Sequence, residues 1–378
     1  MANSNISSGV NSDVNSDVNS VLNKAAKGLW LSAEEGTILY DHAPLADLMY
    51  IAHEIRIKLH PDKNVTWIID RNVNYTNICT TRCKFCNFSK MPGDKDAYIT
   101  TYDSLSNKIK ELYEYGGRQI LIQGGINPEL GLLYFTELFS SLKKDFPWLK
   151  LHALGPHEIH SIAGKEKTGY DKVLRRLVDS GLDSLPGAGA EILSDRVRKI
   201  ISPGKCSAGE WLAVMREAHK MRLVTSATMM YGHAETINER MEHLAAIRKL
   251  QSEKPEGSCG FISFTAWPFQ SEGTVLATKY GITGNNSTAN FIRMNAIIRI
   301  MLPNIPNIQA SWLTAGREAA QLSLCSGVND MGSIMMEENV VSSAGAKKTF
   351  TSITDMRNMI TEAGFIPVQR DQNYNTVI

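Results

Sequence analysis

Three cysteines stand close together in this chain of 378 residues, and their spacing suits a metal centre. Cys79, Cys83 and Cys86 share one short segment, and the next cysteine along the chain is Cys206. Three thiolates on one loop can bind three irons of a cubane cluster and leave the fourth iron open for a small molecule. Zinc is the alternative, but it would need a remote histidine or cysteine as fourth ligand. The spacing therefore favours a cluster with one open iron.

The composition is typical of a globular enzyme, with 43% hydrophobic and 21% charged residues. The 40 Lys and Arg residues balance 39 Asp and Glu residues, so no basic excess indicates a nucleic-acid partner. No stretch is apolar for long enough to span a bilayer, and the N-terminus lacks the basic head and apolar core of a signal peptide. We therefore expect a cytoplasmic protein that acts on a small molecule, with no membrane or nucleic-acid contact.

The six cysteines do not suggest a disulfide framework, because half of them are clustered in a long chain. Cys206, Cys259 and Cys325 are expected to be reduced, buried thiols.

Four segments are expected along the chain. Residues 1–22 are repetitive and polar, which predicts a disordered low-complexity tail. Residues 23–64 have the apolar spacing of an N-terminal helical segment. From residue 65 to 340, strand-like runs alternate with amphipathic helices, which predicts an α/β fold with a parallel sheet closed into a (β/α)8-type TIM-like barrel. Residues 341–378 are expected to form a C-terminal extension packed on the barrel.

The expected strand ends carry glycines and polar residues. Active sites of such barrels lie at the C-terminal ends of the strands. In this chain those ends are the cysteine loop and the stretches GGINP, GPHE, GAGAE, YGHAE and WPFQ, followed by WLTAGRE. Because one rim would hold all of them, they are expected to form one site.

The CxxxCxxC spacing, Phe85 before the last cysteine and the β/α pattern that follows resemble the radical S-adenosylmethionine superfamily. The resemblance implies one 4Fe-4S cluster on Cys79, Cys83 and Cys86, with S-adenosyl-L-methionine on the open iron. It also implies a 5′-deoxyadenosyl radical, and an electron donor such as flavodoxin or ferredoxin. The barrel would supply binding, orientation and exclusion of water.

Four residues are expected to contact this cofactor. Phe85 would pack the adenine, or only pack the loop onto the barrel. Gly124 and Gly125 would meet the methionine amino group, or form a plain turn after the strand. Glu191 would accept hydrogen bonds from a ribose or an ammonium group. Its alternative roles are a helix cap and a partner for an arginine of the next helix.

His233 and Glu235 follow the expected fifth strand and are the candidate proton acceptors. Glu235 has an alternative role as an acidic charge at the start of the next helix. His157 and Glu158 have the same two interpretations.

From about Trp67 to Arg370 the chain resembles the dehypoxanthine futalosine cyclases of the futalosine route to menaquinone. The stretches that carry the resemblance are IIDRNVNYTNIC, CKFCNF, ILIQGGINPEL, LDSLPGAGAEILSDRVRKIISPGKCS, SATMMYGHAET, IQASWLTAG and NDMGSIMMEENVVSSAGA. The resemblance implies that the radical takes a hydrogen from C4′ of the ribose of dehypoxanthine futalosine. The carbon radical would then attack the benzoate ring, and loss of an electron and a proton would give the cyclic product.

Gly155, Arg317, Asn329 and Asp330 are the rim candidates for substrate contacts. The sequence LGPHE around Gly155 departs from the serine-proline-proline type of sequence expected there, which puts that contact in question. Arg317 has a structural salt bridge as its alternative.

Other functions remain open from the sequence. An aminofutalosine synthase or a deazaflavin-synthase-like enzyme would share the cluster and the cofactor, so only substrate turnover separates them. RNA modification is disfavoured by the balanced charge. A metal-binding module without catalysis is the remote alternative.

Overall fold

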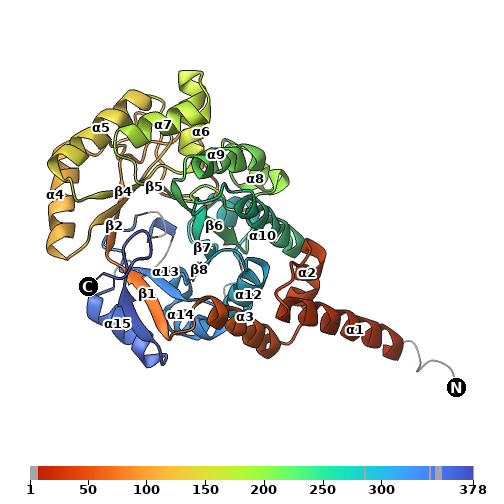
Figure 1. Ribbon diagram of the computed structural model, residues 1–378. Helices are drawn as coiled ribbons and strands as arrows, with labels where there is room; N and C mark the ends of the chain where they lie inside the picture. Colours follow the sequence, from red (N-terminus) through yellow and green to blue (C-terminus); the bar gives the residue numbers. More distant parts are fainter. Residues whose placement is uncertain (1–6, 285–286, 340–341, 345–350, 378) are drawn as a thin grey trace.

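Ten parallel strands form a curled sheet with helices around it (Figure 1). The computed structural model describes residues 7–284, 287–339, 342–344 and 351–377. Within these residues the strands are β1 (Asn64–Ile68), β2 (Asp70–Asn74), β3 (Gln119–Gln123), β4 (Lys150–Ala153), β5 (Ser184–Leu185), β6 (Val224–Tyr231), β7 (Phe261–Pro268), β8 (Asn307–Gln309), β9 (Asp330–Ser333) and β10 (Ile366–Gln369).

The strand order is β10-β1-β9-β8-β7-β6-β5-β4-β3-β2. Only Ile69 separates β1 from β2, although the two strands stand near opposite ends of this order. The sheet must therefore curl round until its two ends meet at Ile69. With β1 and β2 counted as one interrupted strand, eight strands surround the interior and β10 pairs outside them. The predicted (β/α)8-type barrel is confirmed, and the interruption in its first strand is an addition to that prediction.

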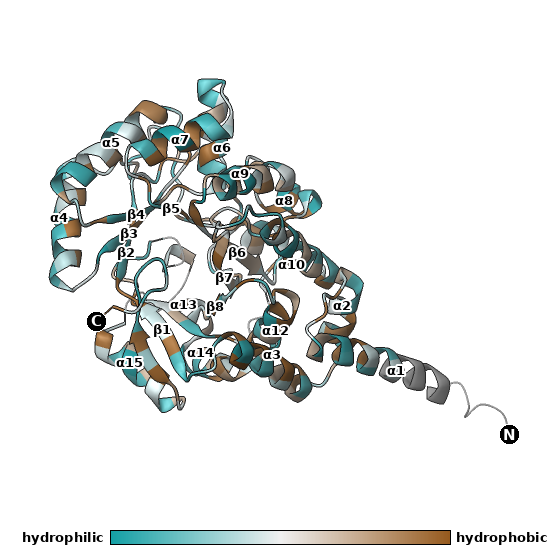
Figure 2. Ribbon diagram, in the orientation of Figure 1, coloured by the Kyte–Doolittle hydropathy of each residue, from teal (hydrophilic) through white to brown (hydrophobic). Residues whose placement is uncertain are grey.

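Amphipathic helices cover the outside of the sheet. In order, they are α4 (Tyr102–Glu114), α5 (Leu132–Asp145), α6 (Pro156–Glu166), α7 (Tyr170–Asp179), α8 (Asp195–Ile201), α9 (Ala208–Lys220), α10 (Ile237–Ser252), α12 (Thr288–Met301) and α14 (Arg317–Ser323). Two short helices lie elsewhere: α11 (Val275–Tyr280) contacts the cysteine loop, and α13 (Trp312–Ala315) borders the interior of the sheet. Figure 2 shows α4 mostly in the hydrophilic colour on its outward side. Trp211 of α9 stacks on Phe261 of β7 at 6.2 Å between ring centroids, which joins the helix layer to the sheet.

Several helices begin at side-chain caps that the sequence encodes locally. At α10, Thr236 accepts a hydrogen bond from the Glu239 N–H, and the Glu239 carboxylate accepts one from the Thr236 N–H. Ser207 and Glu210 make the same reciprocal pair at α9. Such capping boxes satisfy backbone donors that the first turn leaves unpaired, so they fix where each helix begins.

The N-terminal segment differs from its prediction. Three helices precede the barrel, α1 (Ser7–Ala26), α2 (Ala33–His42) and α3 (Leu45–Leu59), so the residues from Ser7 are helical where a disordered tail was expected. Val18, Val21 and Leu22 are buried, because α1 packs on α2 and α3. Tertiary packing of this apolar face stabilises a helix that composition alone disfavours. Residues 1–6 lie outside the described part of the chain.

The C-terminal residues return to the barrel through α15 (Ile353–Glu362) and β10. Trp67 of β1 pairs with Gln369 of β10, and the N–H of Arg370 donates to the carbonyl of Trp67 at 2.9 Å. The last described residues therefore lie next to the point where β1 ends. None of the described helices has the length and hydropathy to cross a membrane.

Candidate active site

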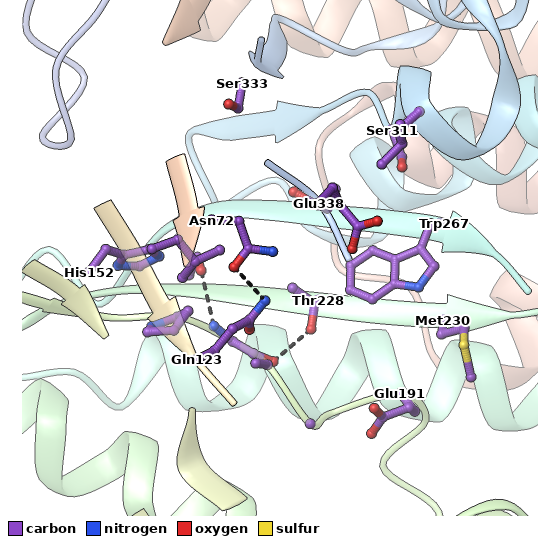
Figure 3. A pocket seen from close by; sticks show the side chains of 18 of the residues that line it. Asn72, Gln123, His152, Glu191, Thr228, Met230, Trp267, Ser311, Ser333 and Glu338 are labelled. Carbon is purple, nitrogen blue, oxygen red and sulfur yellow. Dashed lines mark hydrogen bonds between the residues drawn. The ribbon is translucent and has the colours of Figure 1, made fainter. Parts of the chain in front are cut away.

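A cavity of about 470 Å³ lies inside the curled sheet. Along β6 it is lined by Val224, Ser226, Thr228 and Met230, the alternate residues that point inward. The six residue steps from Val224 to Met230 span about 20 Å, so the cavity extends along almost the whole of β6. In Figure 3, Met230 and Thr228 lie along this wall. The interior is therefore long enough to hold more than one small molecule in line.

The cysteine loop borders the end of this cavity where the strands stop. Cys79, Cys83 and Cys86 all line it, are half-buried and are free of disulfides. Among the described residues, no three His, Cys, Asp or Glu side chains surround one ion position. A single-ion site such as zinc is thus not preformed there. A cubane cluster makes a different demand, because each thiolate binds its own iron at a separate corner.

The end of β3 holds the cysteine loop through two glycines. The N–H of Gly125 donates to the carbonyl of Thr76 at 3.0 Å. A Cβ on Gly125 would lie 2.1 Å from the carbonyl oxygen of Ile78, and one on Gly124 would lie 2.9 Å from that of Thr76. Both glycines line the cavity, and their contact with a cofactor stays a prediction. The structure adds a second reason for them, which is the close approach of the cysteine loop itself.

Glu158 links this strand end to helix α6. Its carboxylate accepts hydrogen bonds from Tyr75 Oη at 2.8 Å, from the Gly124 N–H at 3.2 Å and from the Gly155 N–H at 2.6 Å. Burial raises the pKa of Glu158 to about 7. Glu158 is thus a positioning residue for the Gly124 turn. The sequence alone did not decide between this kind of role and that of a proton acceptor.

His157 supports the cysteine loop from the same helix. Its Nδ1 accepts the N–H of Cys206 at 3.3 Å, so Nε2 carries the hydrogen and donates to Thr81 Oγ1 at 3.0 Å. Burial, with the nearby Lys205 charge, lowers its pKa to about 2 and keeps the ring neutral. Because both ring nitrogens are engaged, His157 is not available as a fourth ligand. Three cysteine ligands, with no histidine available as a fourth, fit a cluster with one open iron.

The remaining cysteines lie outside the cavity lining. All three are free thiols as expected, and Cys206 is buried. Cys259 and Cys325 are exposed, which corrects the expectation that they are buried.

A buried ion pair stands beside the cysteines. Lys205 Nζ lies 2.6 Å from Glu191 Oε1, and Arg198 Nη1 lies 3.9 Å from Glu191 Oε2. Burial disfavours the charge of Lys205. The Glu191 carboxylate nevertheless holds the pKa of Lys205 above its ordinary value. Lys205 also lies 5.3 Å from the centroid of the Phe85 ring. These cations can offset the negative charge that three thiolates and a cluster would bring.

Glu191 and Phe85 both line the cavity, and their contact with a cofactor stays a prediction. The Oε2 atom of Glu191 is buried and has no hydrogen-bond partner within the described residues. Glu191 has φ of 39°, a left-handed backbone angle that is uncommon for a residue other than glycine. The predicted pairing with an arginine exists as the longer contact to Arg198. The sequence analysis did not identify Lys205 as a site residue. The only signal for it in the sequence is its position after a Pro-Gly turn.

His233 and Glu235 do not border the cavity, which corrects their assignment as proton acceptors. His233 Nδ1 lies 2.9 Å from Glu235 Oε2, and Arg240 Nε lies 2.8 Å from Glu235 Oε1. Both side chains are fully buried. Burial disfavours the charge of Glu235. His233 and Arg240 nevertheless lower the pKa of Glu235 to about 2. The pair fixes the turn after β6 and has no access to a substrate.

The predicted substrate contacts are also placed elsewhere. Gly155 caps α6 through Glu158, and Arg317 pairs with Glu362 at 2.7 Å on the surface, which was its structural alternative. Asn329 accepts a hydrogen bond from Arg299 at 2.9 Å in the core. Asp330 begins β9, so Asn329 and Asp330 lie at the start of a strand and not at its rim. None of the four predicted residues lines the cavity.

Glu338 brings a carboxylate into the middle of the cavity. Figure 3 shows its side chain pointing inward beside the indole of Trp267. Its carboxylate accepts the N–H of Ser342 at 2.9 Å. The segment that carries Glu338 was recognised in the sequence only as a family marker, so this residue was missed as a site residue.

The fold and the site together define a class of enzyme. A parallel β/α barrel, whose first strand leads into a loop of three cysteines without a fourth ligand, has the architecture of radical S-adenosylmethionine enzymes. The family profile described as "Radical SAM superfamily" matches residues 73–247, and "CofH/MqnC C-terminal region" matches residues 258–377.

Named relatives narrow this class. The cyclic dehypoxanthine futalosine synthase of Streptomyces coelicolor is 40% identical, over 94% of this chain and 88% of the relative. That of Halalkalibacterium halodurans is 39% identical, over 94% and 93%. The aminodeoxyfutalosine synthase of Thermus thermophilus is 36% identical, over 94% of both chains. The chain belongs to the radical SAM superfamily and, within it, to the family that contains these synthases.

Solved structures support the fold alone. Methylornithine synthase (PylB) superposes with a TM-score of 0.70 at 16% identity, covering 92% of this chain and 97% of that chain. The hydrogenase maturase HydG of Carboxydothermus hydrogenoformans gives 0.71 at 16% identity, covering 97% and 82%.

Proposed function

We propose that this chain catalyses the radical cyclisation of dehypoxanthine futalosine to cyclic dehypoxanthine futalosine, a step of menaquinone biosynthesis. The observation that carries the proposal is the 40% identity to a cyclic dehypoxanthine futalosine synthase across 94% of the chain. The similarity includes both the cysteine loop and the C-terminal half of the barrel, which supplies much of the cavity wall.

One 4Fe-4S cluster on Cys79, Cys83 and Cys86, with S-adenosyl-L-methionine at its open iron, would supply the 5′-deoxyadenosyl radical. The residues around it have separate tasks. The free Oε2 of Glu191 accepts a hydrogen bond from the ammonium or ribose of the cofactor. Phe85 packs against the bound cofactor beside the loop. An external flavodoxin or ferredoxin is the proposed electron donor.

The substrate lies between the cofactor and the closed end of the barrel. Trp267, Leu313 and Met335 form an apolar part of the wall, which suits the aromatic ring of the benzoate. Enclosure by the barrel excludes water and holds the ring against the ribose carbon that it must meet. Such confinement favours cyclisation over quenching of the radical.

Glu338 is the proposed proton acceptor. After the ribose carbon bonds to the ring, the ring must lose one proton and one electron to become aromatic again. Glu338 is the cavity-lining carboxylate beside Trp267, whereas Glu158 and Glu191 lie near the cysteine loop and Asp70 lies where β2 begins. The proton would pass to the Glu338 carboxylate, and the electron would return to the oxidised 4Fe-4S cluster, so that S-adenosyl-L-methionine is the net oxidant.

Anaerobic reconstitution with iron and sulfide, followed by turnover with dehypoxanthine futalosine, S-adenosyl-L-methionine and a reductant, tests the function. We expect the cyclic product together with methionine and 5′-deoxyadenosine. Formation of 5′-deoxyadenosine without the cyclic product would contradict the assignment. In that case aminodeoxyfutalosine synthase activity becomes the next candidate, because that relative is 36% identical over the same share of the chain.

A further inference from the structure

The segment from Arg370 to Tyr374 closes the end of the cavity opposite the cysteine loop. Arg370, Gln372 and Tyr374 line the cavity together with Asp70 and Gln119, which are the first residues of β2 and β3. We call these five residues the floor. Because the strands begin there, the floor lies at the far end of the barrel from the cysteines.

The charged groups of the floor are already paired. Arg370 Nε lies 2.5 Å from Asp330 Oδ2, and Arg370 Nη2 lies 3.2 Å from Asp330 Oδ1. The Asp70 carboxylate accepts hydrogen bonds from Gln119 Nε2 at 3.0 Å and from Ser333 Oγ. The one cation of the floor is thus neutralised by a carboxylate, and Asp70 stands next to it. An anionic ligand has no unpaired positive charge to meet at this end of the cavity.

Two neutral amides of the floor have polar atoms without hydrogen-bond partners among the described residues. Gln372 is 9% exposed, and neither its Oε1 nor its Nε2 has a hydrogen-bond partner among the described residues. Gln119 is 7% exposed, and its Oε1 is unpartnered because its Nε2 faces Asp70. Buried amide groups normally find partners, since leaving them unpaired costs free energy. Both side chains line the cavity, so a bound molecule can supply the missing partners.

We propose that Gln372 and Gln119 bind the sugar hydroxyls of the substrate, so that the ribose faces the floor and the benzoate carboxylate points away from it. This inference rests on the proposed function. A hydroxyl both donates and accepts, which matches two amide oxygens and one amide NH₂. A carboxylate only accepts, and at the floor it would face those oxygens and Asp70. The orientation turns the other face of the ribose toward the cysteine loop.

The test compares the full-length reconstituted enzyme with Gln372→Leu. The matched control is Asn373→Ala, because Asn373 is the next residue and its side chain is exposed. We expect Gln372→Leu to raise the Kd for dehypoxanthine futalosine about tenfold. The affinity for S-adenosyl-L-methionine and the Tm of the ligand-free protein should not fall, since the amide has no protein partner to lose. Asn373→Ala should match the wild type.

A Kd within twofold of the wild type for Gln372→Leu would overturn the inference and leave water as the partner of the amide. Gln372→Met, which keeps an unbranched side chain, is measured in parallel so that a folding defect in one variant does not decide the test. A fall in Tm with both variants would assign Gln372 a structural role and also overturn the inference.

Substrate analogues that each lack one ribose hydroxyl, at C1′, C2′ or C3′, identify the contact. For at least one analogue the penalty of Gln372→Leu should shrink from about tenfold to below twofold, because the partner of the amide is already absent. A penalty that stays near tenfold for all three analogues contradicts a contact with the sugar hydroxyls. If the wild type neither binds nor cyclises dehypoxanthine futalosine, the proposed function fails instead, so the two failures are distinguishable.

Discussion

Lys205 Nζ lies 2.6 Å from Glu191 Oε1, and both side chains are buried where the cavity meets the cysteine loop. The pair joins the loop between α8 and α9 to the segment after β5. Gly204, the residue before Lys205, packs so closely on the cysteine loop that a Cβ would lie 2.7 Å from the carbonyl oxygen of Thr81. The cation is therefore held in place by the loop whose charge it offsets.

Replacing Lys205 by Met should weaken cofactor binding. The substitution leaves Glu191 buried with only the 3.9 Å contact to Arg198, which costs free energy and misdirects the carboxylate. We expect the Kd for S-adenosyl-L-methionine to rise at least tenfold, measured by equilibrium binding to the reconstituted protein. Lys199→Met, on the exposed side of α8, is the matched control and should bind normally. Equal affinities for Lys205→Met and wild type would remove Lys205 from the site.

Gly125→Ala should prevent the cysteine loop from reaching its position. The new Cβ would overlap the carbonyl of Ile78, because only 2.1 Å separates the two atoms. We expect the purified variant to hold less than half of the iron and sulfide of the wild type after reconstitution. Gly209→Ala is the control, since nothing lies within 4 Å of its Cβ and α9 should gain about 0.5–1 kcal/mol. A full cluster content in Gly125→Ala would show that the loop tolerates displacement.

Glu235→Gln should reduce stability in a pH-dependent way and spare catalysis. The pKa of Glu235 is about 2 in the folded protein against 4.5 ordinarily, so its contribution is complete above pH 4.5 and disappears as the pH falls toward 2. The shift corresponds to at most about 3 kcal/mol at neutral pH.

Urea unfolding at pH 7 and pH 3.5 measures this contribution. The difference between wild type and Glu235→Gln should be larger at pH 7. Turnover of the folded variant should stay within a few-fold of the wild type. A hundredfold loss of turnover without a loss of stability would restore Glu235 as a catalytic residue.

Glu338→Gln should separate hydrogen abstraction from product formation. An amide cannot take up the ring proton, so we expect the cyclic product to form about 100-fold more slowly while 5′-deoxyadenosine still accumulates. The control is Glu337→Gln at the next residue, where the carboxylate pairs with Arg71 at 2.9 Å and Lys108 at 2.6 Å. It should lower stability and leave the ratio of the two products unchanged. A normal ratio in Glu338→Gln would exclude it as the proton acceptor.

The cysteine loop, Gly124, Gly125 and Glu191 were predictable because each belongs to a short motif at the end of a strand. The barrel was predictable because strand and helix patterns alternate along most of the chain. Both predictions depend on local sequence, which the fold does not override.

Other features depend on contacts between distant segments. Lys205 and Gln372 reach the cavity from positions far along the chain, and no spacing rule connects them to the cysteines. Asp330 was misplaced because its strand begins there, so the polar residue lies at the opposite end from the rim. Helix α1 forms through the packing of Val18 and Leu22, which its polar composition conceals.

Deuterium transfer tests the central claim most directly. Dehypoxanthine futalosine with deuterium at C4′ is incubated with the reconstituted enzyme, S-adenosyl-L-methionine and a reductant. The masses of the products are then measured by mass spectrometry. We predict one deuterium in 5′-deoxyadenosine for each molecule of cyclic product. Unlabelled 5′-deoxyadenosine, or labelled 5′-deoxyadenosine without any cyclic product, would contradict the account.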